Sequence, residues 1–249
     1  MNINTDGLII KEQNVGEKDR LVTVLTKQEG IIRAFVKGAN IIKSPLSSST
    51  QLLCYSHLCI YKGRNKYIIN EAKPVEIFFN IRKSLEKLVL SQYFCELALA
   101  LAPEGDEAGE FLRLILNSLY LLSNDKKSTA IIKSVLELKL ISISGYMPDL
   151  VGCYICGKYK SKYMYFSIDK GVIICNECCK NEAVNIIKIS LGVLTAMRHI
   201  IYSDLDKLFS FNLSEKSIKN LSSVAEKYLL YVLNKDFKTL NFYKSLNLE

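Results

Sequence analysis

The 249-residue sequence predicts an α+β protein of several domains, in which a small β-barrel is followed by a helical domain with a cysteine-rich insert. Three observations support this fold class. Residues 5–77 hold short runs of β-branched and aromatic residues, helical spacing of apolar residues begins at 81, and five of the eight cysteines fall within 153–179. We expect a barrel at 1–79, a helical domain made of 80–149 and 186–249, and an insert at 150–185.

The composition is that of a packed globular protein. Hydrophobic residues make up 49% and charged residues 23%, which excludes disorder as the dominant state. The longest uncharged stretch, between Lys43 and Lys62, contains a proline, five serines and a histidine, so it lacks the continuous apolar character of a membrane span. The first residues have no basic or apolar region typical of a secretory signal. We therefore expect a cytoplasmic protein.

The barrel should contain five strands, because five β-rich runs stand between turn signals. These runs occupy residues 7–12, 20–26, 31–37, 52–61 and 67–78. Residues 28–30 and 63–66 have the composition of hairpin turns. Five short strands in about 75 residues suit a small closed or partly open barrel.

The helical domain is predicted from a change of periodicity. Apolar residues recur with helical spacing over 81–102, 107–123, 129–144, 190–203 and 214–234. Gly145 should follow the third of these helices as a left-handed terminating residue. Ser190 and Ser214 stand where N-cap residues are expected. The Leu and Ile content of these helices indicates a packed bundle.

The cysteine segment is the strongest local signal. Four cysteines form two matched pairs separated by 18 residues: Cys153 with Cys156, and Cys175 with Cys178. Two residues between paired cysteines let both sulfurs reach one ion, so the pattern predicts one structural Zn2+ per chain. Residues 163–168 and 171–174 should form a hairpin between the pairs, and Cys179 is left over. A redox-active thiol pair or an iron–sulfur cluster explains two matched pairs less well.

The charge distribution favours a polyanionic partner. Lysine and arginine number 33 against 25 acidic residues, and residues 31–73 hold seven basic residues against the single acid Glu71. Alternation in the strand 31–37 puts Arg33, Phe35 and Lys37 on one face, which combines phosphate contacts with a stacking surface. A solvated strand face is the alternative interpretation.

The sequence gives no support to an enzymatic function. No phosphate-binding loop, dinucleotide-binding glycine pattern, Ser–His–Asp arrangement or carboxylate pair stands out. His57 and His199 lie in apolar or amphipathic stretches and are expected in the core or on the surface. In the charged turn 16–20, Glu17 and Asp19 should make local ion pairs.

Together, these segments resemble the RecO family of bacterial DNA repair proteins over nearly the whole chain. The matching pieces are the turn 16–20, Gly30, the segments 37–39 and 43–44, the GYMPDL segment 145–150, and the cysteine pairs with residues 165–167 and 171–172 between them. Two positions depart from the family pattern. Asn40 stands where a basic residue is common, and residues 50–52 replace a usual Leu-Gln-Pro.

The resemblance implies an OB-fold barrel, a helical domain, a zinc-binding insert and no enzyme activity. Proteins of this family bind single- and double-stranded DNA and anneal complementary strands. With the RecR protein they help RecA replace single-strand-binding protein on DNA gaps. A pocket in their helical domain binds the acidic C-terminal tail of single-strand-binding protein. We therefore expect nucleoid association during repair.

The charge pattern of this chain, read for a basic groove that neutralises phosphates, ranks its candidate DNA contacts. Arg33, Lys37 and Lys43 are the best phosphate contacts, and Phe35 is the stacking residue. Second choices are Arg20, Lys62, Arg64 and Lys66. Lys133 or Arg113 could supply the cation for an acidic tail. The alternative functions are a different barrel-plus-zinc protein that binds RNA, and a scaffold that binds only proteins.

Overall fold

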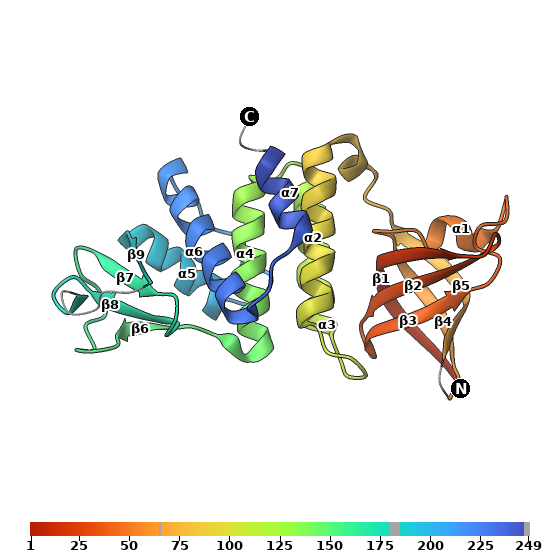
Figure 1. Ribbon diagram of the computed structural model, residues 1–249, viewed down its shortest axis with the longest axis horizontal. Helices are drawn as coiled ribbons and strands as arrows, with labels where there is room; N and C mark the ends of the chain where they lie inside the picture. Colours follow the sequence, from red (N-terminus) through yellow and green to blue (C-terminus); the bar gives the residue numbers. More distant parts are fainter. Residues whose placement is uncertain (65, 180–184, 247–249) are drawn as a thin grey trace. The chain divides into compact units, whose positions relative to one another are not determined.

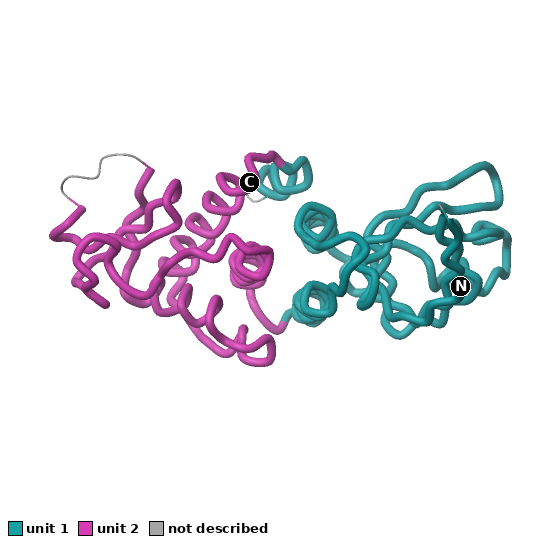
Figure 2. Tube along the Cα trace, turned by 90° about the horizontal axis from the view of Figure 1, so that it is seen from below, with its two compact units in different colours: residues 1–125, 237–249 teal, residues 126–236 magenta. Residues whose placement is uncertain are grey.

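A computed structural model describes residues 1–64, 66–179 and 185–246 (Figure 1). The chain divides into two compact units, Met1–Asp125 with Phe237–Glu249 and Lys126–Asp236 (Figure 2). The first unit combines the barrel with helices, and the second combines helices with the cysteine segment. The domain boundaries expected from the sequence stay a prediction.

The first unit begins with a closed five-stranded barrel of order β1-β2-β3-β5-β4. The strands are β1 (Asn2–Val15), β2 (Asp19–Thr26), β3 (Gly30–Val36), β4 (Tyr55–Lys62) and β5 (Tyr67–Glu76). All neighbouring pairs are antiparallel except β3 and β5. The predicted five-stranded barrel is therefore confirmed. The turn predicted at 63–66 includes residue 65, which lies outside the described residues.

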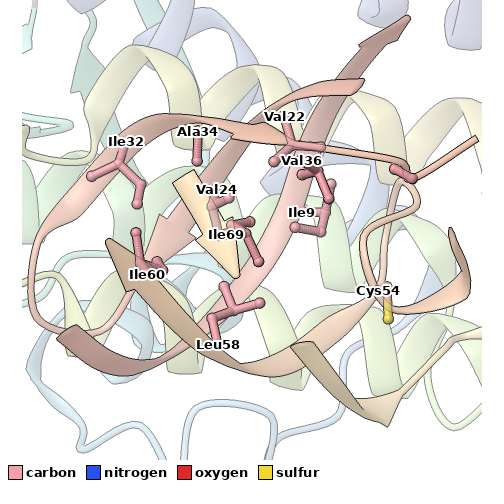
Figure 3. Packing of buried hydrophobic residues seen from close by; sticks show 11 residues of the cluster. Ile9, Val22, Val24, Ile32, Ala34, Val36, Cys54, Leu58, Ile60 and Ile69 are labelled. Carbon is pink, nitrogen blue, oxygen red and sulfur yellow. The ribbon is translucent and has the colours of Figure 1, made fainter. Parts of the chain in front are cut away.

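Strand alternation builds the core of the barrel. Inward-facing aliphatic side chains from all five strands meet there (Figure 3): Ile9, Val22, Val24, Ile32, Ala34, Val36, Leu58, Ile60 and Ile69. Each fully buried valine, leucine or isoleucine stabilises the fold by about 1.5–3 kcal/mol. The short helix α1 (Pro45–Ser49) packs Leu46 against this core. Helix α1 was not predicted, because five residues are too few to show a helical period.

Four further helical segments complete the first unit: η1 (Phe79–Lys83), α2 (Leu85–Leu101), α3 (Gly109–Ser123) and α7 (Lys238–Leu246). Helix α2 starts later than predicted, because Ser84 caps it by accepting a hydrogen bond from the Lys87 amide at 3.4 Å. Helix α7 was not predicted. It is joined to α2 by the rings of Phe237 and Tyr93, whose centroids lie 5.6 Å apart.

The β2–β3 hairpin contacts the loop that follows α2. The Ile31 amide donates to the Pro103 carbonyl at 2.8 Å, and the Gly105 amide donates to the Glu29 carbonyl at 3.0 Å. Gly30 has φ +60, and a Cβ atom there would lie 2.0 Å from the Pro103 carbonyl oxygen. Only glycine fits this turn without displacing the backbone.

The second unit contains α4 (Thr129–Ile141), the π-helical turn η2 (Ser142–Tyr146), α5 (Leu191–Tyr202) and α6 (Glu215–Leu233). Gly145 has φ +93, as predicted for a helix-terminating residue. Ser190 caps α5 by accepting from the Val193 amide at 3.3 Å. Ser214 stands at the expected position before α6, but its hydroxyl donates to Ser217 Oγ at 3.1 Å and caps no amide. Ser214 is nevertheless the N-cap residue by position, as predicted, and its carbonyl accepts a hydrogen bond from the Ile218 amide at 2.9 Å.

A four-stranded sheet of order β6-β8-β7-β9 completes the second unit. Its strands are β6 (Asp149–Cys153), β7 (Met164–Ser167), β8 (Val172–Cys175) and β9 (Ile186–Ile189). The predicted hairpin corresponds to β7 and β8, which pair in antiparallel fashion. The flanking strands β6 and β9 were not predicted. No helix in the described part of the chain is long and apolar enough to cross a membrane.

Helix α4 is buried along almost its whole length and carries an internal ion cluster. Lys133 Nζ lies 2.9 Å from Glu137 Oε1 and 2.8 Å from Glu226 Oε2, and the Lys133 side chain is only 3% exposed. Burial would lower the pKa of Lys133, but the two carboxylates raise it above its usual value. The expectation that Lys133 could bind an acidic tail at a pocket rim is therefore wrong.

Candidate metal centre and nucleic-acid interface

The four predicted cysteines converge at one end of the sheet in the second unit. Cys153 and Cys175 end the parallel strands β6 and β8, and each is followed by a tight turn that carries its partner, Cys156 or Cys178. The four sulfur atoms lie within 4.8 Å of one another. A tetrahedral site with metal–sulfur bonds of about 2.3 Å needs sulfurs about 3.8 Å apart. The separation of 3.7 Å between Cys156 Sγ and Cys175 Sγ fits that geometry.

Backbone hydrogen bonds hold both turns in place. The Gly157 amide donates to the Cys153 carbonyl at 2.8 Å, and the Cys178 amide donates to the Cys175 carbonyl at 3.1 Å. Gly157 has φ +72, which favours glycine directly after the first turn. The amide of Cys175 donates to Cys153 Sγ at 3.2 Å and so joins the two cysteine pairs.

Backbone amides around Cys153 change the acidity of its thiol. Burial alone would raise the pKa of Cys153, but amide donors from Cys175, Cys156 and Ile155 lower it to about 6. The pKa of Cys178 is raised to about 12, mainly because its hydrogen bonds with the Cys175 and Cys156 thiols favour the neutral form. Sulfur ligands must be deprotonated to bind a metal, and the Cys153 environment favours that state. The four thiols can hold a metal ion.

Arg198 of α5 joins the cysteine segment to the helices, a role that was not predicted from the sequence. Its guanidinium donates to the carbonyls of Leu150 at 2.7 Å, Val151 at 3.0 Å and Tyr159 at 2.8 Å. No local pattern could have revealed this role, because the partners lie 39 to 48 residues away in the chain. Cys179 lies outside the four-sulfur group, and residues 180–184 of the predicted insert are outside the described residues.

The second candidate site is the outer face of β3. Arg33, Phe35 and Lys37 are exposed, and the residues between them are buried in the barrel core. Phe35 keeps 40% of its surface exposed, so part of its ring is open to a ligand. The predicted alternation is confirmed. A row of cations around an exposed aromatic ring is a surface suited to phosphates and unpaired bases.

Strand register adds Lys11 to this face. Lys11 of β1 pairs with Thr23 of β2, and Thr23 pairs with Arg33 of β3, so the three side chains share one row. A hollow of about 270 Å³ beside this row is lined by Lys11 and Arg33 and bounded by Leu99 and Glu104 on the helical side. Lys11 could not be placed on this face from the sequence, because a register irregularity between Ile9 and Lys11 decides which way its side chain faces.

Arg20 and Asp19 fix the loop that follows β3. The Arg20 guanidinium donates to the Ser47 carbonyl at 3.2 Å and to Asn40 Oδ1 at 3.1 Å, and it lies 3.3 Å from Glu12 Oε2. Asp19 accepts a hydrogen bond from the Gly38 amide at 2.8 Å. Asp19 thus binds backbone in the described structure, where a local ion pair was expected. Arg20 is 11% exposed, and its contacts give it a bracing role.

Of the remaining predicted DNA contacts, one is paired with a carboxylate within the chain and three are exposed on loops. Lys62 Nζ lies 2.6 Å from Glu29 Oε2, so its charge is partly neutralised within the chain. Lys43, Arg64 and Lys66 are exposed on loops. Their roles, like those of Arg33, Phe35 and Lys37, stay predictions.

An OB-like barrel with a basic and aromatic outer face, followed along the chain by helices and a four-thiol site, defines a modular protein with an OB-like domain and a candidate metal centre. Residues 1–78 match the family model described as "Recombination protein O N terminal". Residues 82–241 match the family model described as "Recombination protein O C terminal". The chain belongs to the RecO family of DNA repair proteins, which confirms the resemblance found in the sequence.

Three relatives, each named DNA repair protein RecO, are similar along almost their whole length. The protein of Acetivibrio thermocellus is 38% identical over 98% of this chain and 97% of its own. Those of Alkaliphilus metalliredigens and Caldicellulosiruptor saccharolyticus are 29% and 31% identical, over 99% and 97% of this chain and 100% and 98% of their own. The similarity therefore covers both the barrel and the cysteine segment.

Proposed function

We propose that this chain is a DNA-binding recombination mediator without enzymatic activity. It binds and anneals DNA strands and, with RecR, helps load RecA onto DNA covered by single-strand-binding protein, whose acidic tail is a further partner. The observation that carries the proposal is the exposed row of Arg33, Phe35 and Lys37 beside Lys11 on the barrel of a RecO-family chain. OB-folds bind oligonucleotides on one face of their strands. We therefore expect DNA to bind to the outer face formed by β1, β2 and β3.

Binding would rest on electrostatics and stacking. Lysine and arginine contacts to phosphates release condensed counterions, so affinity should fall steeply as salt concentration rises. Phe35 offers a ring face to an unpaired base. Two complementary strands held on one basic surface repel each other less, which favours their annealing.

The four thiols would hold one structural Zn2+. With Cys153, Cys156, Cys175 and Cys178 all bound, no coordination position stays open for a substrate or water, so the ion would stabilise the fold of its segment and take no part in a reaction. Its binding free energy would contribute directly to folding of the β6–β9 sheet.

The direct test of the barrel face is a charge reversal of Arg33 and Lys37. We expect Arg33→Glu with Lys37→Glu to weaken binding of single-stranded DNA at least about tenfold, because two phosphate contacts become repulsive. The matched control is Lys27→Glu with Lys73→Glu, which makes the same change of charge around a different hollow on the barrel. Equal affinities of the two variants would move the DNA site elsewhere.

Further outcomes separate the alternatives. Preference for RNA over single-stranded DNA of matched sequence would indicate an RNA-binding protein. Absence of any salt-sensitive nucleic-acid binding would indicate a scaffold that binds proteins. The mediator role itself is tested by following RecA assembly on DNA coated with single-strand-binding protein, with and without RecR and this chain. No acceleration would restrict the function to DNA binding or annealing.

A further inference from the structure

The segment after the first cysteine pair has an unusual surface. Residues 154–163 read YICGKYKSKY, with three tyrosines, three lysines and no acidic residue. Every residue of the segment is exposed except the half-buried Ser161. Tyr154 and Tyr159 keep 65% and 60% of their surface exposed. A metal site needs its cysteines and tight turns, but it does not need exposed tyrosines beside them.

Cations from other elements of the same unit lie over the tyrosine rings of Tyr159 and Tyr163. Lys188 Nζ of β9 lies 3.7 Å from the centre of the Tyr163 ring, and the Arg198 guanidinium of α5 lies 3.9 Å from the centre of the Tyr159 ring. Arg198 is fixed in turn by three backbone carbonyls. The rings are therefore preorganised, and each carries positive charge on one side.

Most of the lysine charge on this surface is not neutralised. Lys158 pairs with Glu177 at 2.7 Å. In the part of the chain that the structure describes, Lys160, Lys162 and Lys188 form no ion pair with a carboxylate. Unpaired cations next to exposed rings complement a ligand that has both phosphates and flat apolar faces.

We propose that this Lys–Tyr surface is a second binding site for single-stranded nucleic acid. The surface consists of Tyr154, Lys158, Tyr159, Lys160, Lys162, Tyr163 and Lys188. Phosphates would contact Lys160, Lys162 and Lys188, and unpaired bases would stack on Tyr154 and Tyr159. A duplex keeps its bases stacked on each other, and an acidic peptide offers carboxylates without ring faces, so an unpaired strand fits best. The inference extends the proposed DNA-binding function to the second unit.

The test measures binding of fluorescein-labelled oligothymidylate to the full-length, metal-loaded chain over a salt series. We expect Lys160→Glu with Lys162→Glu to lower affinity at least about fivefold and to reduce the slope of log affinity against log salt by about 1.4, the value for two phosphate contacts on a single strand. The control Lys207→Glu with Lys227→Glu changes the charge of the same unit equally, at exposed lysines outside this surface. Similar losses in both variants would overturn the inference.

Tyr154→Leu tests the stacking role separately, because it removes a ring and leaves the charge unchanged. We expect it to weaken binding about fivefold or more, with an unchanged salt slope. Ultraviolet crosslinking of the unmutated chain to 5-iodouracil-containing oligonucleotide should label a peptide containing Tyr154 or Tyr159. This readout decides the question even if a variant loses its metal and misfolds. Crosslinks confined to other peptides would overturn the inference.

One further comparison separates this inference from the proposed barrel site. In the Arg33→Glu, Lys37→Glu background, we expect residual oligothymidylate binding that disappears when Lys160→Glu and Lys162→Glu are added. If the barrel variant alone abolishes all binding, the second site fails and the barrel proposal stands. If only the Lys–Tyr variants lose binding, the barrel proposal fails and the second site stands. Loss of affinity for a polyaspartate peptide, with oligothymidylate affinity unchanged, would indicate a protein partner and overturn the inference.

Discussion

At the scale of single residues, neighbouring side chains of the same type have different roles. Cys178 lies within the four-sulfur group, whereas the adjacent Cys179 does not. The spacing of the two matched pairs predicted Cys178 as a ligand and left Cys179 over. The geometry resolves the choice, because only Cys178 brings its sulfur within 4.8 Å of the other three.

We expect Cys178→Ser to lose the bound metal and Cys179→Ser to retain it. Removing one of four thiolates breaks the tetrahedral site, whereas Cys179 supplies no ligand to it. Metal content per chain, measured by inductively coupled plasma mass spectrometry on both purified variants, checks this prediction. Retention of one metal per chain by Cys178→Ser would contradict the assignment.

The buried ion cluster of α4 makes a prediction about stability. Lys133→Met should lower the free energy of unfolding by about 3–5 kcal/mol, because it leaves the Glu137 and Glu226 carboxylates without the charge between them. Adding Glu137→Leu should recover part of that loss. Urea denaturation measures both effects, with the exposed Lys227→Met as the control, expected to change the stability by less than about 0.5 kcal/mol. A Lys133→Met effect as small as the control would refute the structural role of the cluster.

At the scale of elements, the sequence predicted what depends on local period and missed what depends on distant partners. The alternation of β3 and the helical spacing of α3 to α6 are local, and both were found. The bulge that turns Lys11 outward, the strands β6 and β9, and the helix α7 are set by pairing or packing with distant segments. Arg198 belongs to the same group, since its three acceptors become neighbours only in the folded chain.

The contact between the β2–β3 hairpin and the loop after α2 can be tested at one glycine. Gly30→Ala should destabilise the chain by about 3 kcal/mol, because its Cβ would meet the Pro103 carbonyl in addition to the strain of a positive φ. Gly16 has nearly the same φ, +62, but nothing lies within 4 Å of its Cβ position. Gly16→Ala should therefore cost only about 1 kcal/mol. Thermal unfolding of the two variants measures the difference in stability. Equal decreases in the unfolding temperature would show that the contact with the Pro103 carbonyl does not contribute to stability.

At the scale of the whole molecule, the net charge of +8 includes basic residues of two kinds. Some, such as Arg33 and Lys37, are exposed, and others, such as Arg20 and Lys133, are paired with carboxylates within the chain. The family, the barrel and the four-cysteine site were predictable, because the order and spacing of short motifs and the local alternation of strand residues indicate them. The structural roles of Arg20 and Lys133 were not, because a basic residue in a sequence looks the same whether its partner is a phosphate or a carboxylate within the chain. Burial and distances to partners supply that distinction.

The most direct test of the central claim is binding of the unmutated chain to single-stranded and duplex DNA over a salt series, with the metal content of the same batch measured. We expect tight binding of single-stranded DNA that falls steeply with salt, and about one zinc per chain. Protein that contains zinc and is folded, yet shows no salt-dependent affinity for DNA, would contradict the claim that this chain itself binds DNA.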